Sequence, residues 1–107
     1  MKLGELKRLL FLERGKYGIV KCEVEGCDQL AEHAHHVFYR RKKGKKDVKE
    51  FDQKENIQLV CENCHMYNGK ALTMENKYQF WEKQCARYGK DHMEGWRESL
   101  PVRIKHF

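Results

Sequence analysis

Apolar side chains recur at helical spacing near the beginning of the chain and again in its last third. The first set is Leu3, Leu6, Leu9 and Leu10. This spacing predicts a helix over residues 3–14, which ends at Gly15. The second set is Met74, Tyr78, Trp81, Cys85 and Tyr88. It predicts a helix that Thr73 caps and Gly89 ends, with this stripe facing the core or a second copy of the chain.

The segments between these helices have the character of short strands. Residues 17–21 predict one strand, and the His-rich stretch 32–39 predicts a second, extended one. The apolar run 57–60 predicts a third strand, followed by a helix that carries His65 in its first turn.

The last part of the chain predicts one more short helix. Asp91 and Glu94 have the spacing of a capping box, and Pro101 stops the helix. Residues 73–100 would thus form a helical extension. With 107 residues, the chain is expected to be one small α+β domain over 1–107.

Charge and apolar content exclude a membrane-spanning protein. Lys and Arg number 22 against 16 Asp and Glu, which gives a net charge of +6. The longest apolar run, Leu9–Leu12, is far shorter than the roughly 20 residues of a membrane span, and too short for the apolar part of a secretory signal. We therefore expect a cytoplasmic protein in a reducing compartment, where cysteines bind metals more often than they form disulfides.

Four of the five cysteines form two closely spaced pairs. Cys22 and Cys27 have four residues between them, and Cys61 and Cys64 have two. Four thiolates at such spacing suit a tetrahedral structural Zn²⁺. Its binding free energy, about 10–16 kcal/mol in small peptides, is comparable to the stability of a whole domain. Cys85 lies in the second helical stripe and is expected to be a small buried apolar side chain.

The positive charge is concentrated in one stretch. Residues 40–46 hold six basic side chains and no acidic one, so the net charge of the chain resides there. They are Arg40, Arg41, Lys42, Lys43, Lys45 and Lys46. Such a block is either a solvated loop or an arm that contacts the backbone phosphates of DNA without reading bases.

Clustered histidines point to phosphodiester hydrolysis. That reaction needs a cation, a base with a pKa near neutrality and a positive surface for the polymer. Successive side chains of a strand point to opposite faces, so His35 and His36 can supply one metal ligand and one base. His65 can reach the same metal from the following helix. His33 shares a face with His35, where a packing role is favoured over that of an extra ligand.

Taken in order, these motifs resemble the HNH endonuclease family, the ββα-metal or His-Me finger nucleases. The resemblance covers about residues 20–70 and rests on the runs 34–37 (Ala-His-His-Val) and 56–65 (Asn-Ile-Gln-Leu-Val-Cys-x-x-Cys-His). It implies a small ββα-metal domain with flanking helices, stapled by zinc. The implied zinc ligands are Cys22, Cys27, Cys61 and Cys64.

The resemblance also implies a role for each residue of the motif. His35 and His65 would bind a catalytic divalent ion, for which Mg²⁺, Mn²⁺, Zn²⁺ and Ni²⁺ all stay open. His36 would be the general base. Asn56 would brace the loop and orient His36. Where some members of the family have a third ligand, this chain has Gly69, which cannot ligate.

The implied activity is hydrolysis of DNA phosphodiester bonds with weak sequence specificity, by nicking or cleaving duplex or branched DNA. The stretch 80–89 is similar to the tails of small phage recombination nucleases, so we expect a phage-encoded protein in the host cytoplasm. We expect it to be a monomer or a homodimer. Where sequence specificity is required, a protein partner would supply it. Two alternatives stay open. One is a non-catalytic zinc-binding nucleic-acid-binding module, and the other is an interaction protein whose helix 73–89 docks a partner.

Overall fold

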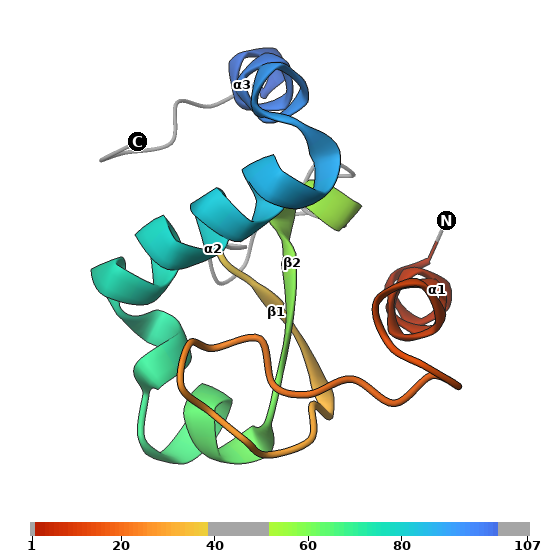
Figure 1. The fold of residues 1–107 in the computed structure, drawn as a ribbon, viewed down its shortest axis with the longest axis vertical. Helices are drawn as coiled ribbons and strands as arrows, with labels where there is room; N and C mark the ends of the chain where they lie inside the picture. The colour runs from red at the N-terminus through yellow and green to blue at the C-terminus, as the bar shows by residue number, and fades with distance from the viewer. Residues whose placement is uncertain (1, 39–51, 101–107) are drawn as a thin grey trace.

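A computed structural model describes residues 2–38 and 52–100. In this part of the chain, helices surround a two-stranded antiparallel sheet, so the architecture is α+β as predicted (Figure 1). The helices are α1 (Leu3–Arg14), α2 (Met74–Tyr88) and α3 (Lys90–Ser99), and the strands are β1 (His33–His36) and β2 (Ile57–Val60). Shorter helical turns are η2 (Lys54–Asn56), η3 (Asn63–Tyr67) and η4 (Lys70–Leu72). None of the helices within the described ranges combines the length and apolar character needed to cross a membrane.

Two predicted helices and one predicted strand are confirmed. α1 covers the predicted residues, and the backbone N–H of Gly15 donates to the carbonyl of Phe11 at 3.2 Å. α2 begins after Thr73, whose Oγ1 accepts from the backbone N–H of Asn76 at 3.0 Å. β2 covers the predicted run 57–60. Local signals sufficed here because periodicity and capping lie within a few residues of one another.

The strand predicted over 17–21 is wrong. Tyr17 has a φ of 57° and Gly18 a φ of 76°, so the chain turns here and forms only isolated bridges on either side. The strand predicted over 32–39 is shorter than expected, since β1 ends at His36. Beyond it, the backbone N–H of Val37 donates to the Asn56 carbonyl at 3.0 Å. The last predicted residue of that strand, at position 39, lies outside the described residues.

The two remaining helical predictions are correct in place but not in detail. α3 begins directly after Gly89, whose φ of 100° allows the chain to turn from α2 into α3. Asp91, predicted to cap this helix, lies inside it instead. The helix after β2 is only the π-helical turn η3. Gly69 follows it in the left-handed conformation, and η4 begins there.

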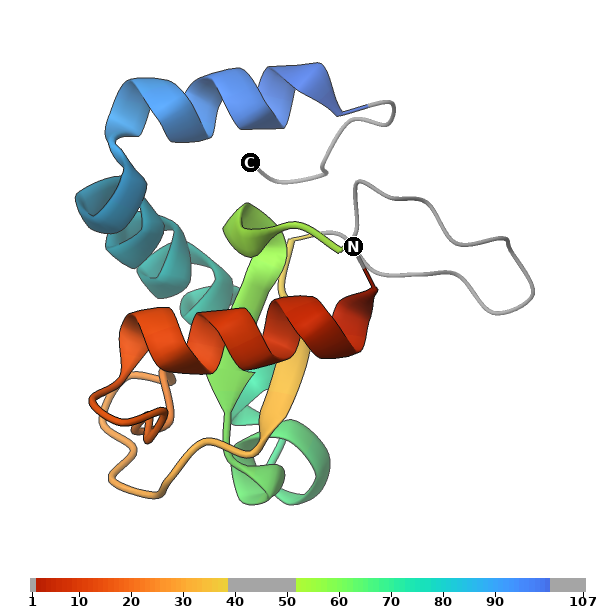
Figure 2. The ribbon, with the colours of Figure 1, turned by 90° about the vertical axis from the view of Figure 1, so that its right-hand side faces the viewer.

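The sheet separates two environments. β1 and β2 pair with His33 opposite Val60 and His35 opposite Gln58. Side chains alternate along each strand, so Ile57 packs with α1 while Gln58 faces the other side, toward α2. Figures 1 and 2 show α1 and α2 on opposite sides of the two strands.

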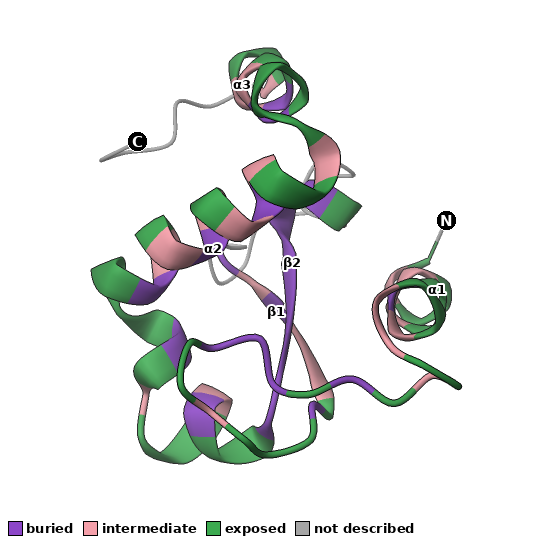
Figure 3. Cartoon of the chain, in the orientation of Figure 1, coloured by how far each residue is buried: buried purple, intermediate pink, exposed green. Residues whose placement is uncertain are grey.

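The buried face of α2 differs from the predicted apolar stripe. Met74 and Tyr78, at the start of that stripe, are 41% and 51% exposed. The fully buried positions are Asn76, Phe80 and Gln84, spaced four residues apart along the side that meets the sheet (Figure 3). Phe80 joins an apolar cluster with the segment after β1 and with α3, and the rest of that cluster is Val37, Phe38, Met93 and Trp96. Both buried amides are hydrogen bonded. Asn76 Nδ2 donates to Gln58 Oε1 at 2.8 Å, and Gln84 Nε2 donates to the carbonyls of Lys54 and Glu55 at 3.0 and 3.1 Å.

Candidate metal centre and histidine cluster

The four predicted zinc cysteines lie together. Their Sγ atoms are all within 4.8 Å of one another, and the residues are Cys22, Cys27, Cys61 and Cys64. The Sγ atoms of Cys27 and Cys61 are 3.7 Å apart. A tetrahedral zinc with Zn–S bonds of about 2.3 Å has sulfur atoms about 3.8 Å apart, so this spacing fits the ion. The cluster could therefore hold a structural metal such as zinc.

Backbone turns and hydrogen bonds bring these four thiols together. Gly26, with a φ of 82°, turns the chain between the first two cysteines, where the Cys27 N–H donates to the Val24 carbonyl at 3.1 Å. In the second pair, the backbone N–H of Cys64 donates to the Cys61 Sγ at 3.4 Å. The Cys61 N–H donates to the Cys22 Sγ at 3.3 Å and links the pairs. N–H donors directed at sulfur stabilise the thiolate form that a metal requires.

The cysteines of the cluster differ in how readily they lose a proton. Burial raises the pKa of Cys22 to about 11, and burial followed by hydrogen bonding with Cys61 also raises the pKa of Cys64. For Cys61, burial acts in the same direction, but hydrogen bonds from the Cys64 backbone and the neighbouring thiols outweigh it and lower its pKa. A metal at this centre must therefore displace protons from at least two thiols.

Cys85 has no part in the cluster. It is half-buried and packs against the apolar cluster between α2 and α3, where burial, followed by Glu82, raises its pKa. The prediction that it serves as a small apolar side chain agrees with this placement.

Three histidines gather beside the cysteine cluster. The ring centroids of His35 and His65 are 5.0 Å apart, and those of His33 and His65 are 5.4 Å apart. His33 and His35 come from the same face of β1, and His65 comes from η3, directly after Cys64. Nε2 of His33 is buried and has no hydrogen-bond partner in the described part of the chain. Sequence reasoning brought His35 and His65 together, and for His33 it favoured a solvent or packing role over that of an extra ligand.

His35 is held by a backbone carbonyl. Its Nε2 lies 3.1 Å from the carbonyl oxygen of Ala71, and the ring is buried. Because a carbonyl only accepts, Nε2 carries the proton and Nδ1 keeps the lone pair in the neutral ring. The same carbonyl accepts from Asn76 Nδ2 at 2.9 Å. Neither Ala71 nor Asn76 carries a sequence signal that connects it with the histidines.

His36 lies on the opposite face of β1 and meets a carboxylate. Its Nε2 is 2.8 Å from Oδ1 of Asp52, with side-chain exposures of 26% and 20%. The carboxylate accepts the Nε2 proton, which leaves Nδ1 as the basic atom of the neutral ring. The separation of His35 and His36 onto two faces was predicted from strand alternation. Asp52 was not singled out, because nothing in its local sequence distinguishes it from other acids after the basic stretch.

Asn56 holds the segment that follows His36. It is fully buried, and its Oδ1 accepts from the backbone N–H of Phe38 at 2.9 Å. Its carbonyl also accepts from Val37. These bonds fix residues 37 and 38. Most of the loop that Asn56 was predicted to brace lies outside the described residues, and its role in orienting His36 stays a prediction. Gly69 provides no ligand, and the six predicted DNA-contacting residues of 40–46 lie outside the described residues.

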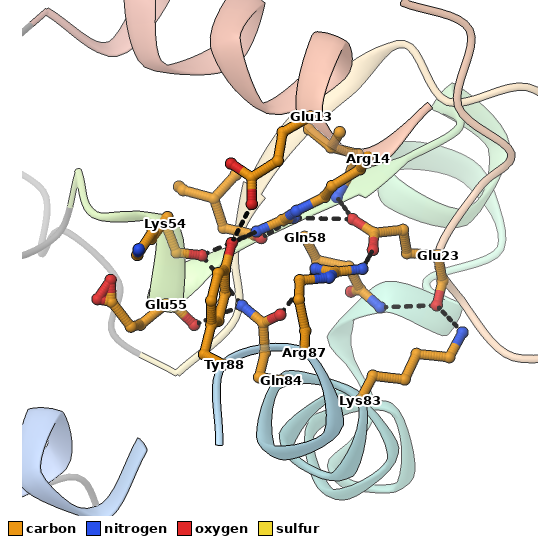
Figure 4. A network of polar contacts seen from close by, with 12 residues as sticks. Glu13, Arg14, Glu23, Lys54, Glu55, Gln58, Lys83, Gln84, Arg87 and Tyr88 are labelled. Atoms are coloured by element: carbon orange, nitrogen blue, oxygen red, sulfur yellow. Dashed lines mark hydrogen bonds and ion pairs between the residues drawn. The ribbon is translucent and has the colours of Figure 1, made fainter. Parts of the chain in front are cut away.

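A buried ion-pair network fixes the first cysteine pair to both helices (Figure 4). Glu23, next to Cys22, accepts from Arg14 of α1 at 2.9 Å and from Arg87 of α2 at 2.6 Å. Its Oε1 also accepts from the Leu59 N–H of β2 at 2.8 Å. Arg14 and Glu23 are only 2% and 7% exposed. This arrangement makes the network a structural support of the candidate site.

Comparisons of the chain with known protein families, curated proteins and solved structures gave no match. The chemistry of the site must therefore be inferred from its own residues.

Proposed function

We propose that this protein is a metal-dependent endonuclease of the HNH, ββα-metal type that hydrolyses DNA phosphodiester bonds. The observation that carries the proposal is the approach of His35 and His65, whose ring centroids are 5.0 Å apart although the residues belong to β1 and η3. These are the two histidines for which the sequence motif implies a shared metal.

The order of elements supports the proposal. β1 and β2 pair in antiparallel fashion, and η3 follows β2 with His65 in it. The cysteine cluster, at the end of β2, would bind zinc and fix η3 against the strands. A structural metal replaces the larger apolar core that a chain of this size lacks.

The histidine pair fits a divalent ion by its chemistry. Imidazole suits borderline transition ions, and a ligating histidine commonly donates its other ring N–H to a carbonyl. His35 has this arrangement, with Nε2 on the Ala71 carbonyl. When bound, a divalent ion supplies a Lewis acid that neutralises charge on the phosphoryl and leaving oxygens.

His36 would act as the general base. Asp52 holds the Nε2 proton, so the proton of the attacking water would pass to Nδ1. The water oxygen then attacks phosphorus, and the 3′-oxygen leaves. Asp52 keeps the ring in one tautomer and favours the imidazolium that forms.

The basic stretch 40–46 would hold the DNA. Its six cationic side chains match a binding mode that is dominated by phosphates and indifferent to sequence. With about six phosphate contacts, affinity would fall on the order of a thousandfold between about 50 and 200 mM salt.

Nicking of supercoiled plasmid tests the proposal. Wild-type protein with Mg²⁺ or Mn²⁺ is expected to nick the plasmid, and His36→Ala to slow nicking by roughly 10²–10⁴-fold. His92→Ala is the matched control, because His92 is 46% exposed on α3, where its ring contacts Glu55 and Tyr88. Full activity of His36→Ala would remove His36 as the base.

The cysteine cluster by itself favours a second function, a zinc-binding nucleic-acid-binding module without catalysis. The same assay separates the two. If wild-type protein binds the plasmid in a salt-dependent manner and never nicks it with any of the four candidate ions, the binding module is the correct assignment.

A further inference from the structure

His33 occupies a position in the site that neither the motif nor a packing role explains. It lies two residues before His35, so both side chains project from one face of β1. The pairing of β1 with β2 sets His33 opposite Val60. The chain then turns at Cys61, and the His65 N–H donates to the Cys61 carbonyl at 3.1 Å. This turn brings the His65 ring beside His33.

The Nε2 atom of His33 is placed as a buried polar atom that an ion or a water would satisfy. It is buried and, within the ranges that the structure describes, accepts and donates no hydrogen bond. A buried polar atom without a partner costs about 1–3 kcal/mol, so such atoms commonly mark the place of an ion or an ordered water. Three imidazole rings that lie side by side offer three nitrogen ligands, a set that suits a transition-metal ion.

We infer that His33 is a third protein ligand of the catalytic ion, so that His33, His35 and His65 form a three-imidazole site for Zn²⁺, Ni²⁺ or Co²⁺ in preference to Mg²⁺. This inference rests on the proposed nuclease site and adds to it both a ligand and a class of metal. Three protein nitrogens leave further coordination positions open for water and a phosphate oxygen, which is the arrangement of catalytic sites.

The three rings lie near one another, but their nitrogen atoms are not arranged as a complete metal site. In the described part of the chain, the four cysteines are the only group of three or more metal-ligating side chains arranged to hold a metal ion. Two imidazoles that share a tetrahedral ion through bonds of about 2.0–2.1 Å have ring centroids roughly 5 Å apart, and the separations of 5.4 and 5.0 Å from His65 to His33 and His35 are of this size. Rotation of the rings about their side-chain torsions would close the site, without a change in the strand pairing.

The test counts the imidazoles around a second metal. Protein that holds zinc in the cysteine cluster is given one equivalent of Ni²⁺, and X-ray absorption at the nickel edge reports the nickel ligands separately from those of zinc. Three imidazoles are expected for wild type and two for His33→Gln. Nickel affinity of the variant, measured by calorimetry, should fall at least about tenfold. His92→Ala should leave both results unchanged.

The outcomes separate this inference from the proposed function. Two imidazoles in wild type, with His33→Gln unchanged, would overturn the third ligand and leave the site on His35 and His65 intact. If no nickel binds beyond the cysteine cluster, the three-imidazole site is wrong, and the plasmid assay with Mg²⁺ or Mn²⁺ decides the proposed function separately. Circular dichroism of each variant shows whether the fold is retained.

A second variant distinguishes a ligand role of His33 from a packing role. His33→Asp replaces the imidazole with a carboxylate, which can still ligate but prefers harder ions. It should retain a second metal and shift the preference from Ni²⁺ toward Mn²⁺ at least several-fold. A packing role for His33 predicts no change in metal preference, so an unchanged Ni²⁺ to Mn²⁺ ratio would contradict the inference.

Discussion

Gln58 and Asn76 hydrogen bond to each other in both directions. Gln58 Nε2 donates to Asn76 Oδ1 at 3.0 Å, and Asn76 Nδ2 donates to Gln58 Oε1 at 2.8 Å. Gln58 is fully buried and Asn76 is 2% exposed. Asn76 also donates to the Ala71 carbonyl, which accepts a hydrogen bond from His35 Nε2 as well. The pair thus joins β2 to α2 and helps position a candidate metal ligand.

Breaking this amide pair should destabilise the fold. Asn76→Leu leaves the buried Gln58 Oε1 without the donor that Asn76 supplies, so the free energy of unfolding should fall by about 1–3 kcal/mol in denaturant titration. Gln58→Leu together with Asn76→Leu removes both amides and should recover part of that loss. Gln79→Leu on the same helix is the control, since Gln79 bonds only loosely to exposed Glu75 at 3.4 Å. Equal effects of Asn76→Leu and Gln79→Leu would contradict the structural role of the pair.

Loss of the Glu23 carboxylate charge should cost more. Glu23→Gln leaves Arg14, 2% exposed, without its counter-charge, and removing one partner of a buried ion pair costs about 3–5 kcal/mol. Glu25→Gln is the matched control two residues away. Glu25 pairs with Lys83 at 3.4 Å across an exposed surface, so its change should stay within about 0.5 kcal/mol. Similar thermal unfolding of the two variants would argue against a buried network.

These polar contacts mark the limit of what the sequence could predict. α1, α2 and β2 were predicted because periodicity and caps are local signals, and the cysteine pairs were recognisable from their spacing. Gln58 and Asn76 are 18 positions apart, and Glu23 and Arg87 are 64 apart. Hydrogen bonds between such distant positions leave no periodic pattern. The face of α2 was therefore assigned to its apolar stripe. Trp81, Cys85 and Tyr88 of that stripe do pack against the core, but the fully buried positions include two amides.

The same limit applies to the candidate site. Strand alternation predicted that His35 and His36 face opposite sides, because it depends only on the period of a strand. The partners that fix the two rings, the Ala71 carbonyl and Asp52, depend on where later segments fold back, and no local pattern announces them. The burial of the His33 Nε2 atom likewise appears only in three dimensions.

Removal of the cysteine-bound metal should unfold the protein. The cysteine cluster is itself one of the apolar clusters of the structure, together with Val24, Val60 and Ala71. We expect one tightly bound zinc per chain when the histidine site is empty, and loss of helical circular dichroism after strong chelation. Cys22→Ser should abolish this zinc, while Cys85→Ser should retain it. A chelated protein with an unchanged spectrum would show that the core is stable without metal.

Zinc affinity at this cluster should fall as the pH falls. Burial raises the pKa of Cys22 to about 11 and also raises the pKa of Cys64, so both thiols keep their protons at neutral pH in the metal-free protein. Zinc binding displaces those protons, and each one makes the apparent affinity about tenfold weaker per unit of acidification. Two protons give about a hundredfold per unit, measurable by chelator competition between about pH 6 and 8. A pH-independent affinity would mean that the thiolates form before zinc arrives.

The contact between His36 and Asp52 yields the last prediction, which concerns the proposed reaction. Asp52→Asn keeps the size of the side chain, but the amide can present its N–H to His36 Nε2 and so favour the tautomer with the proton on Nδ1. That tautomer cannot accept a proton from water at Nδ1. Plasmid nicking should therefore slow by more than about tenfold, up to the roughly 10²–10⁴-fold expected when the base itself is removed.

A variant that keeps the charge distinguishes this positioning role from a structural one. Asp52→Glu, which keeps the charge, should restore part of the rate. Asp91→Asn is the control, because Asp91 is exposed on α3. If Asp52→Glu nicks no faster than Asp52→Asn, Asp52 supports the fold and does not set the tautomer of His36.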